Sequence, residues 1–88
     1  MPLYIIERNF AEQLEFTKEG VARDLEVDAD EGIHWIISFL SADKKKTYCL
    51  YEAPDPEPIR AAARRLGIPA DVIIEVGEVK PYEIMAGG

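Results

Sequence analysis

The chain has 88 residues, of which 48% are hydrophobic, which is enough for one small domain and too little for a second core. Its net charge of -7 and isoelectric point of about 4.6 oppose binding to nucleic acid or to an anionic membrane, because both depend on Lys and Arg. The single cysteine, Cys49, excludes an internal disulfide and a cysteine-rich zinc site. Residues 1–8 lack the pattern of a secretory signal, so we expect a soluble, cytoplasmic protein.

The first half of the chain predicts a strand, a helix and a hairpin. Residues 3–8 are rich in strand-forming side chains. Thr17 is expected to cap a helix that ends within residues 28–32. Residues 33–40 and 47–53 are then expected to pair as the two strands of a hairpin, because a short polar segment joins them.

The second half predicts a helix, a strand and a tail. Asp55 has the side chain of an N-cap, Pro56 suits the first helical position, and Gly67 suits the end of the helix. Residues 72–79 predict the fourth strand, so residues 1–80 form a single domain and 81–88 a C-terminal tail. The side of the second helix that faces the core is expected to carry Ile59, Ala62, Ala63 and Leu66.

The order of these elements predicts a ferredoxin-like βαββαβ sandwich of the α+β class. Because crossover connections are right-handed, both helices should lie on one face of a four-stranded sheet. The strands should then follow the spatial order 4-1-3-2, numbered along the chain.

The predicted strands are apolar on both faces, although two helices cover only one face. In the second strand we expect one face to carry Ile33, Trp35, Ile37 and Phe39, and the other Ile36 and Leu40. A second copy of the sheet would bury the remaining face, which predicts a homodimer of the dimeric α/β-barrel type. The alternative is a monomer with exposed aromatic side chains.

Carboxylates and one imidazole are candidate metal ligands. Glu7, Glu52 and Glu75 lie on three strands that are neighbours in the predicted order, so they converge if their faces align. Such a cluster suits a divalent cation, and His34, the only histidine, offers the ligand that nickel or zinc prefers. The alternatives are unrelated glutamates that reach solvent or pair with basic residues, and a partly exposed histidine at a strand edge.

Aromatic side chains could line a small-ligand pocket between two sheets. Trp35, Tyr48 and Tyr51 are the candidates, and the competing interpretation places them in the core. Cys49 is expected to be a small buried hydrophobic residue. The chain shows no known catalytic motif, so no catalytic residue is assigned and a binding protein is favoured over an enzyme. The alternative is a small cofactor-free enzyme with an apolar pocket in a dimeric α/β barrel.

Two blocks of the sequence resemble a known family. Residues 29–54, ADEGIHWIISFLSADKKKTYCLYEAP, and residues 55–76, DPEPIRAAARRLGIPADVIIEV, together with the opening PLYIIERNF, are similar to a bacterial family of small ferredoxin-like proteins. The family is classed as a domain of unknown function and includes a nickel-binding member. The resemblance implies the βαββαβ fold and a homodimer, and it suggests nickel as a ligand. Ala62 and Ile37 stand where the family pattern commonly has a histidine and a polar residue.

Overall fold

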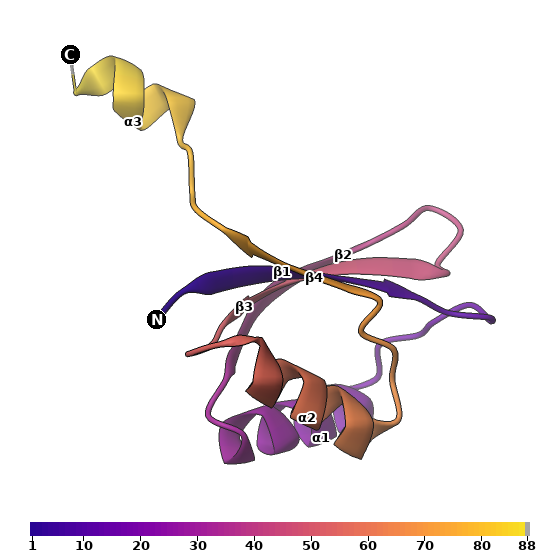
Figure 1. Ribbon diagram of the computed structural model, residues 1–88. Coiled ribbons are helices and arrows are strands. Elements are labelled where there is room, and N and C mark those ends of the chain that lie inside the picture. The colour runs from indigo at the N-terminus through magenta and orange to yellow at the C-terminus, as the bar shows by residue number, and fades with distance from the viewer. Residues whose placement is uncertain (88) are drawn as a thin grey trace.

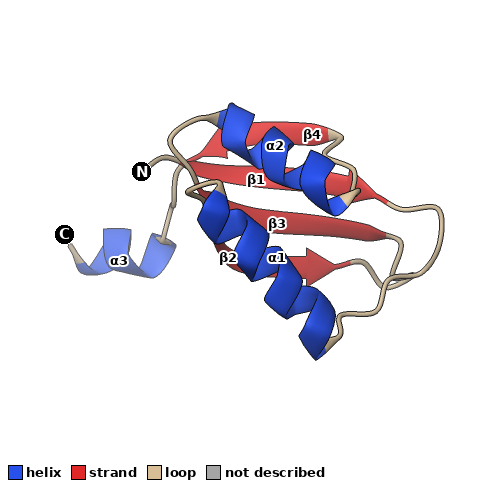
Figure 2. Cartoon of the chain, turned by 90° about the horizontal axis from the view of Figure 1, so that it is seen from below, coloured by secondary structure: helices blue, strands red, loops and turns tan. Residues whose placement is uncertain are grey.

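The computed structural model describes residues 1–87 and has the predicted ferredoxin-like fold. Figures 1 and 2 show α1 and α2 packed on one face of a four-stranded sheet, with the opposite face uncovered. The elements, in chain order, are β1 (Leu3–Asn9), α1 (Lys18–Asp30), β2 (His34–Leu40), β3 (Lys46–Glu52), α2 (Pro56–Leu66), β4 (Val72–Val76) and α3 (Pro81–Ala86).

The strand order confirms the prediction. The sheet runs β2-β3-β1-β4, which is the predicted order read from the other edge, and every neighbouring pair is antiparallel. α1 connects β1 to β2 and α2 connects β3 to β4, and each of these connections crosses one intervening strand of the sheet.

The predicted caps position both large helices. The Thr17 hydroxyl oxygen accepts a hydrogen bond from the Gly20 amide at 3.0 Å at the start of α1. The Asp55 carboxylate accepts one from the Glu57 amide at 2.8 Å at the start of α2. Gly67 ends α2 with φ 67°, a left-handed conformation that glycine adopts without a Cβ clash.

Asp55→Ala is expected to destabilise the domain by about 0.5–2 kcal/mol, because the Glu57 amide loses its acceptor. Urea denaturation followed by circular dichroism measures the change. Glu12→Ala, at an exposed position before α1, is the control and should leave the midpoint almost unchanged. Equal midpoints for Asp55→Ala and the wild type would contradict a stabilising role for this cap.

The core lies between the sheet and the two helices. Ile6 from β1 and Ile59 from α2 are 0% and 1% exposed, and Leu66 packs against the same cluster while partly buried. The predicted inner side of α2 is therefore confirmed. Cys49 is buried among these residues, as expected of a small hydrophobic side chain.

One strand departs from regular alternation. β2 has a bulge between Trp35 and Ile37, which pair with consecutive residues of β3 although Ile36 separates them. Trp35 therefore lies on the helix-covered face, whereas Ile37 and Phe39 lie on the uncovered face. The prediction that these three side chains share a face is wrong, because an extra residue shifts the two-residue period of a strand.

The C-terminal segment extends away from the sheet. β4 ends at Val76, three residues earlier than predicted, and α3 stands apart from the rest of the chain in both ribbon views (Figures 1 and 2). The predicted tail 81–88 thus contains a short helix, and residue 88 lies outside the described residues. None of the helices within residues 1–87 has both the length and the apolar character needed to cross a membrane.

Candidate functional site

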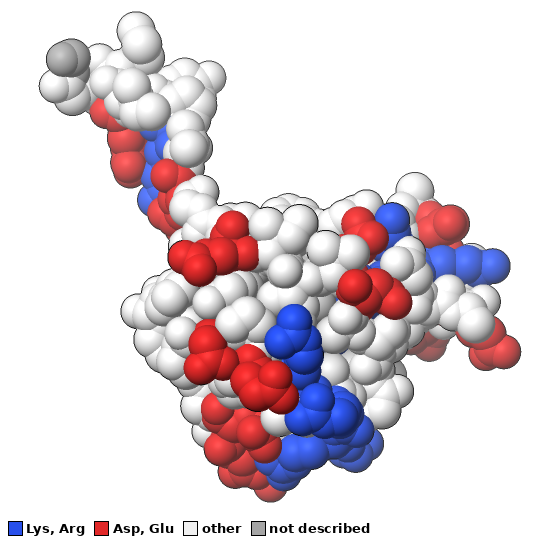
Figure 3. All heavy atoms as spheres, in the orientation of Figure 1, with Lys and Arg blue, Asp and Glu red and all other residues white. Residues whose placement is uncertain are grey.

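The uncovered face of the sheet is mainly apolar. Ile37, Phe39 and Ile74 are 46%, 59% and 54% exposed there. Many charged side chains gather around the helices below the sheet in Figure 3, and others lie at its right-hand end and along the segment that leads to α3. Three rows cross all four strands of this face, each taking one residue from β2, β3, β1 and β4 in that order: His34, Glu52, Leu3 and Val76; Ile37, Leu50, Ile5 and Ile74; Phe39, Tyr48, Glu7 and Val72.

The three glutamates predicted to converge lie apart. Glu75 pairs with Tyr4 on the helix-covered face, so it is on the opposite side of the sheet from the other two. Glu7 and Glu52 share the uncovered face but are four positions apart in the β1–β3 register, or about 13 Å. Glu7 instead lies 3.6 Å from the Lys46 ammonium. The prediction that the three glutamates converge is therefore wrong. Strand order alone determines neither the register of two paired strands nor the face of the sheet on which a side chain lies.

His34 and Glu52 are brought together at one end of the uncovered face. They are paired residues of β2 and β3, and His34 Nδ1 lies 3.0 Å from Glu52 Oε1. Their side chains are 66% and 37% exposed. In the tautomer with a proton on Nδ1, the ring donates to the carboxylate and leaves the Nε2 lone pair free. A carboxylate that orients a histidine in this way is the usual partner of a metal-binding imidazole.

One chain does not complete a metal site. Within residues 1–87, no group of three or more His, Cys, Asp or Glu side chains is placed to hold a metal ion. The His34–Glu52 pair thus provides an oriented imidazole and one carboxylate. Divalent ions bound by such residues take four to six ligands, so further ligands would have to come from water or from another chain.

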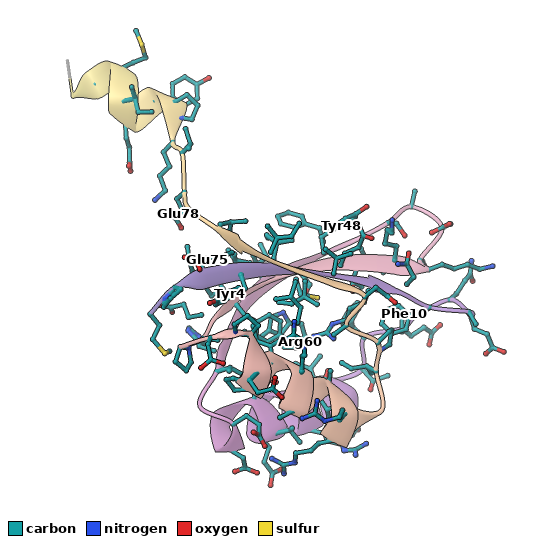
Figure 4. All side chains as sticks on the ribbon, viewed as in Figure 1. Tyr4, Phe10, Tyr48, Arg60, Glu75 and Glu78 are labelled. Carbon is teal, nitrogen blue, oxygen red and sulfur yellow. The ribbon has the colours of Figure 1, made fainter. Side chains whose placement is uncertain are left out.

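The aromatic residues predicted to form one pocket lie on two faces. Trp35 and Tyr51 stack on the helix-covered face, with ring centroids 6.4 Å apart and planes at 12°. Tyr48 lies on the uncovered face, with its ring 5.5 Å from the Lys46 ammonium; Figure 4 shows it on the opposite side of the sheet from the helices. The predicted pocket between two sheets is therefore wrong for Trp35 and Tyr51.

Trp35 and Tyr51 instead line a cavity of about 130 Å³ between the sheet, α1 and the segment before α1. Three charged residues also line it: Arg8 from β1, which is 4% exposed, Glu15 from the segment before α1, and Asp24 from α1. Burial raises the pKa of the Asp24 carboxyl, and it raises the pKa of the Tyr51 hydroxyl well above its ordinary value. This cavity was not predicted from the sequence.

A signal for the buried arginine was present in the sequence. Arg8 is in phase with Tyr4 and Ile6, the core-facing residues of β1, and a charged residue at such a position requires a specific partner. Asp28 gave no comparable signal, because it lies in an acidic stretch at the end of a helix. It is 2% exposed, and its Oδ2 atom has no hydrogen-bond partner within the described part of the chain.

Comparisons with known proteins agree with this fold. The model of a family described as nickel responsive protein SCO4226-like matches residues 4–76. A solved structure, the crystal structure of SCO4226 from Streptomyces coelicolor A3(2), is similar with a TM-score of 0.75 and 24% sequence identity. The similarity covers 89% of this chain and 99% of that chain. The search of curated proteins found no match.

Proposed function

Because this chain belongs to the SCO4226-like family of nickel responsive proteins, we propose that it is a cytoplasmic homodimer that binds nickel. The observation that carries the proposal is the His34–Glu52 pair, which is solvent-accessible and lies at the end of an uncovered apolar face. The two parts of the proposal, the dimer and the metal, depend on different features of the sheet.

The dimer is supported by the middle row of the uncovered face. Ile37, Leu50, Ile5 and Ile74 cross all four strands without a polar residue. An apolar surface that extends across a whole sheet is uncommon in a monomer and is stabilised by leaving water. A second copy offers the same apolar rows, and closed two-fold symmetry is the most common arrangement of such copies.

The metal is supported by the chemistry of the pair. Nickel(II) is bound well by imidazole nitrogen, and the carboxylate of Glu52 holds the His34 ring in one orientation. One chain supplies too few ligands, whereas two chains in a dimer supply two imidazoles and two carboxylates. The bound ion would link the two chains, so nickel would stabilise the assembly as well as each fold.

Nickel is expected to raise the melting temperature of the wild-type protein. A ligand that binds only the folded state adds about 2.7 kcal/mol when its free concentration is a hundred times its dissociation constant. His34→Ala should abolish the increase, and Glu52→Gln should weaken nickel binding about 10- to 100-fold. Glu75→Gln is the matched control, because Glu75 lies on the opposite face and its replacement should leave binding unchanged.

Isothermal titration with nickel, zinc and calcium provides the second measurement. We expect nickel and zinc to bind and calcium to bind more weakly, because calcium prefers sites made only of oxygen ligands. Equal binding of nickel by the wild type and His34→Ala would contradict the proposed site. No heat and no thermal shift with nickel would contradict metal binding altogether.

A further inference from the structure

The cavity on the helix-covered face is separate from the proposed nickel site. It lies behind the Phe10–Phe16 part of the chain, between α1 and the strands, while His34 projects from the other face of the sheet. Its wall is largely apolar, with Phe16, Trp35 and Tyr51 among the lining residues. The ring centroid of Phe16 is 6.3 Å from that of Trp35, and Phe16 is half exposed. Phe16 thus forms the part of the aromatic wall that is nearest to solvent.

Arg8 provides a buried positive charge in this cavity. Its guanidinium donates a hydrogen bond to the Pro69 carbonyl and lies 6.0 Å from the centroid of the Tyr51 ring. Among the described residues, no carboxylate lies within 4.0 Å of it. A guanidinium has five N–H donors and remains charged at any physiological pH. Asp24 and Asp28 act on this charge from beyond ion-pair distance, and an anion in direct contact with the guanidinium would compensate it more closely.

The acidic residues around the cavity are better solvated than Arg8. Glu15 is exposed. Asp24 is half-buried; burial raises its pKa, and the positive charges of Arg8 and then of Arg23 oppose that rise. Water and these two arginines therefore already compensate much of the charge of the acidic residues. The Arg8 guanidinium is far more buried and forms no ion pair within 4.0 Å among the described residues, so direct contact with a ligand anion is favoured over contact with a ligand cation.

The cavity is partly open to solvent, and its volume indicates the size of the apolar body that it can hold. An engineered apolar cavity of about 150 Å³ in another protein accommodates benzene, so a cavity of about 130 Å³ suits roughly six to ten non-hydrogen atoms. The aromatic wall favours a flat apolar body over a polar one.

From these features we propose that the cavity binds a small aromatic or flat apolar carboxylate. The carboxylate accepts hydrogen bonds from the Arg8 guanidinium, and the apolar body packs against Trp35 and Phe16. A planar guanidinium donates two parallel hydrogen bonds to a carboxylate, which adds orientation to charge. The proposal holds whether or not the protein binds nickel, because none of the residues in this contact lies on the uncovered face.

The test uses Trp35 as its reporter, because it is the only tryptophan of the chain and lines the cavity. Fluorescence of the full-length protein is titrated with benzoate, benzyl alcohol and benzylamine, which share a ring and differ in charge. We expect a saturable change with benzoate and binding about tenfold or more weaker for benzyl alcohol, because hydrogen bonds to charged groups exceed neutral ones. Equal affinities, tighter binding of benzylamine, or no saturable change with benzoate would each overturn the proposal.

Two variants locate the contact. Arg8→Gln should lower benzoate affinity about tenfold or more and leave benzyl alcohol binding almost unchanged. Arg64→Gln removes an exposed arginine of α2 and is the control, with benzoate binding as in the wild type. Phe16→Ala, at a half-exposed position, should weaken benzoate and benzyl alcohol equally. Circular dichroism shows whether Arg8→Gln folds. If it does not, the comparison of the three ligands on the wild type, together with the effect of Phe16→Ala on their binding, still decides the outcome.

Discussion

Ile74→Glu is expected to convert the proposed dimer into a folded monomer. Ile74 lies in the middle row of the uncovered face and is 54% exposed in the single chain, so a charge there remains hydrated when the chain is alone. In a dimer the same carboxylate would be buried in an apolar interface opposite a second copy, which costs several kcal/mol for each unpaired charge. Sedimentation velocity should report twice the chain mass for the wild type and a single chain mass for the variant.

Leu25→Glu is the matched control for this change. Leu25 is an exposed apolar residue of α1, 46% exposed, and it lies on the helix side of the molecule. Its replacement adds the same charge to the chain and should leave the dimer intact. A wild-type protein that sediments as a monomer, or equal dissociation by both substitutions, would contradict an interface on the uncovered face.

Asp28→Asn is expected to remove much of the pH dependence of stability between about pH 4 and pH 6. Burial, with a smaller contribution from Asp24, raises the pKa of the Asp28 carboxyl to about 6, while Arg8 opposes the shift. The folded state therefore holds this proton more tightly than the unfolded state. The wild type is stabilised by protonation below about pH 4 and loses that stabilisation as pH rises through 6, up to roughly 3 kcal/mol.

Asparagine carries no charge at any of these pH values, so the free energy of unfolding of Asp28→Asn should lack this fall. The free energy of unfolding of the variant minus that of the wild type should therefore become more positive from pH 4 to pH 7. Denaturation curves measured at each pH give this difference. Glu26→Gln, an exposed position on the same helix, is the control and should follow the wild type. A constant difference across the range would show that Asp28 titrates in the folded state as it does in the unfolded state.

The elements and their order were predictable because they depend on local chemistry and on chirality. The N-caps Thr17 and Asp55 and the glycine after α2 identify the helix ends from a few neighbouring residues. Right-handed crossovers then leave one strand order for this sequence of elements. None of these inferences requires knowledge of how the side chains of two strands align.

The candidate site was predictable only in part, because it depends on register. The approach of His34 to Glu52 follows from one pairing between β2 and β3, whereas Glu7 and Glu75 are separated by position and by face. The bulge at Ile36 has no glycine or other local marker, so simple alternation placed Trp35 on the wrong side. The cavity around Arg8 arises from packing among β1, α1 and the preceding segment, and periodicity does not describe such contacts.

The pairing of β2 with β3 joins the two proposed sites through the backbone. His34 faces Glu52 on one side of the sheet, and the next residues, Trp35 and Tyr51, face each other on the other side. The bulge follows immediately, at the most irregular point of β2. A change in backbone position there would alter the metal ligand and the aromatic wall together. Thermodynamic linkage then requires reciprocity: the factor by which nickel changes the affinity for a carboxylate equals the factor by which the carboxylate changes the affinity for nickel.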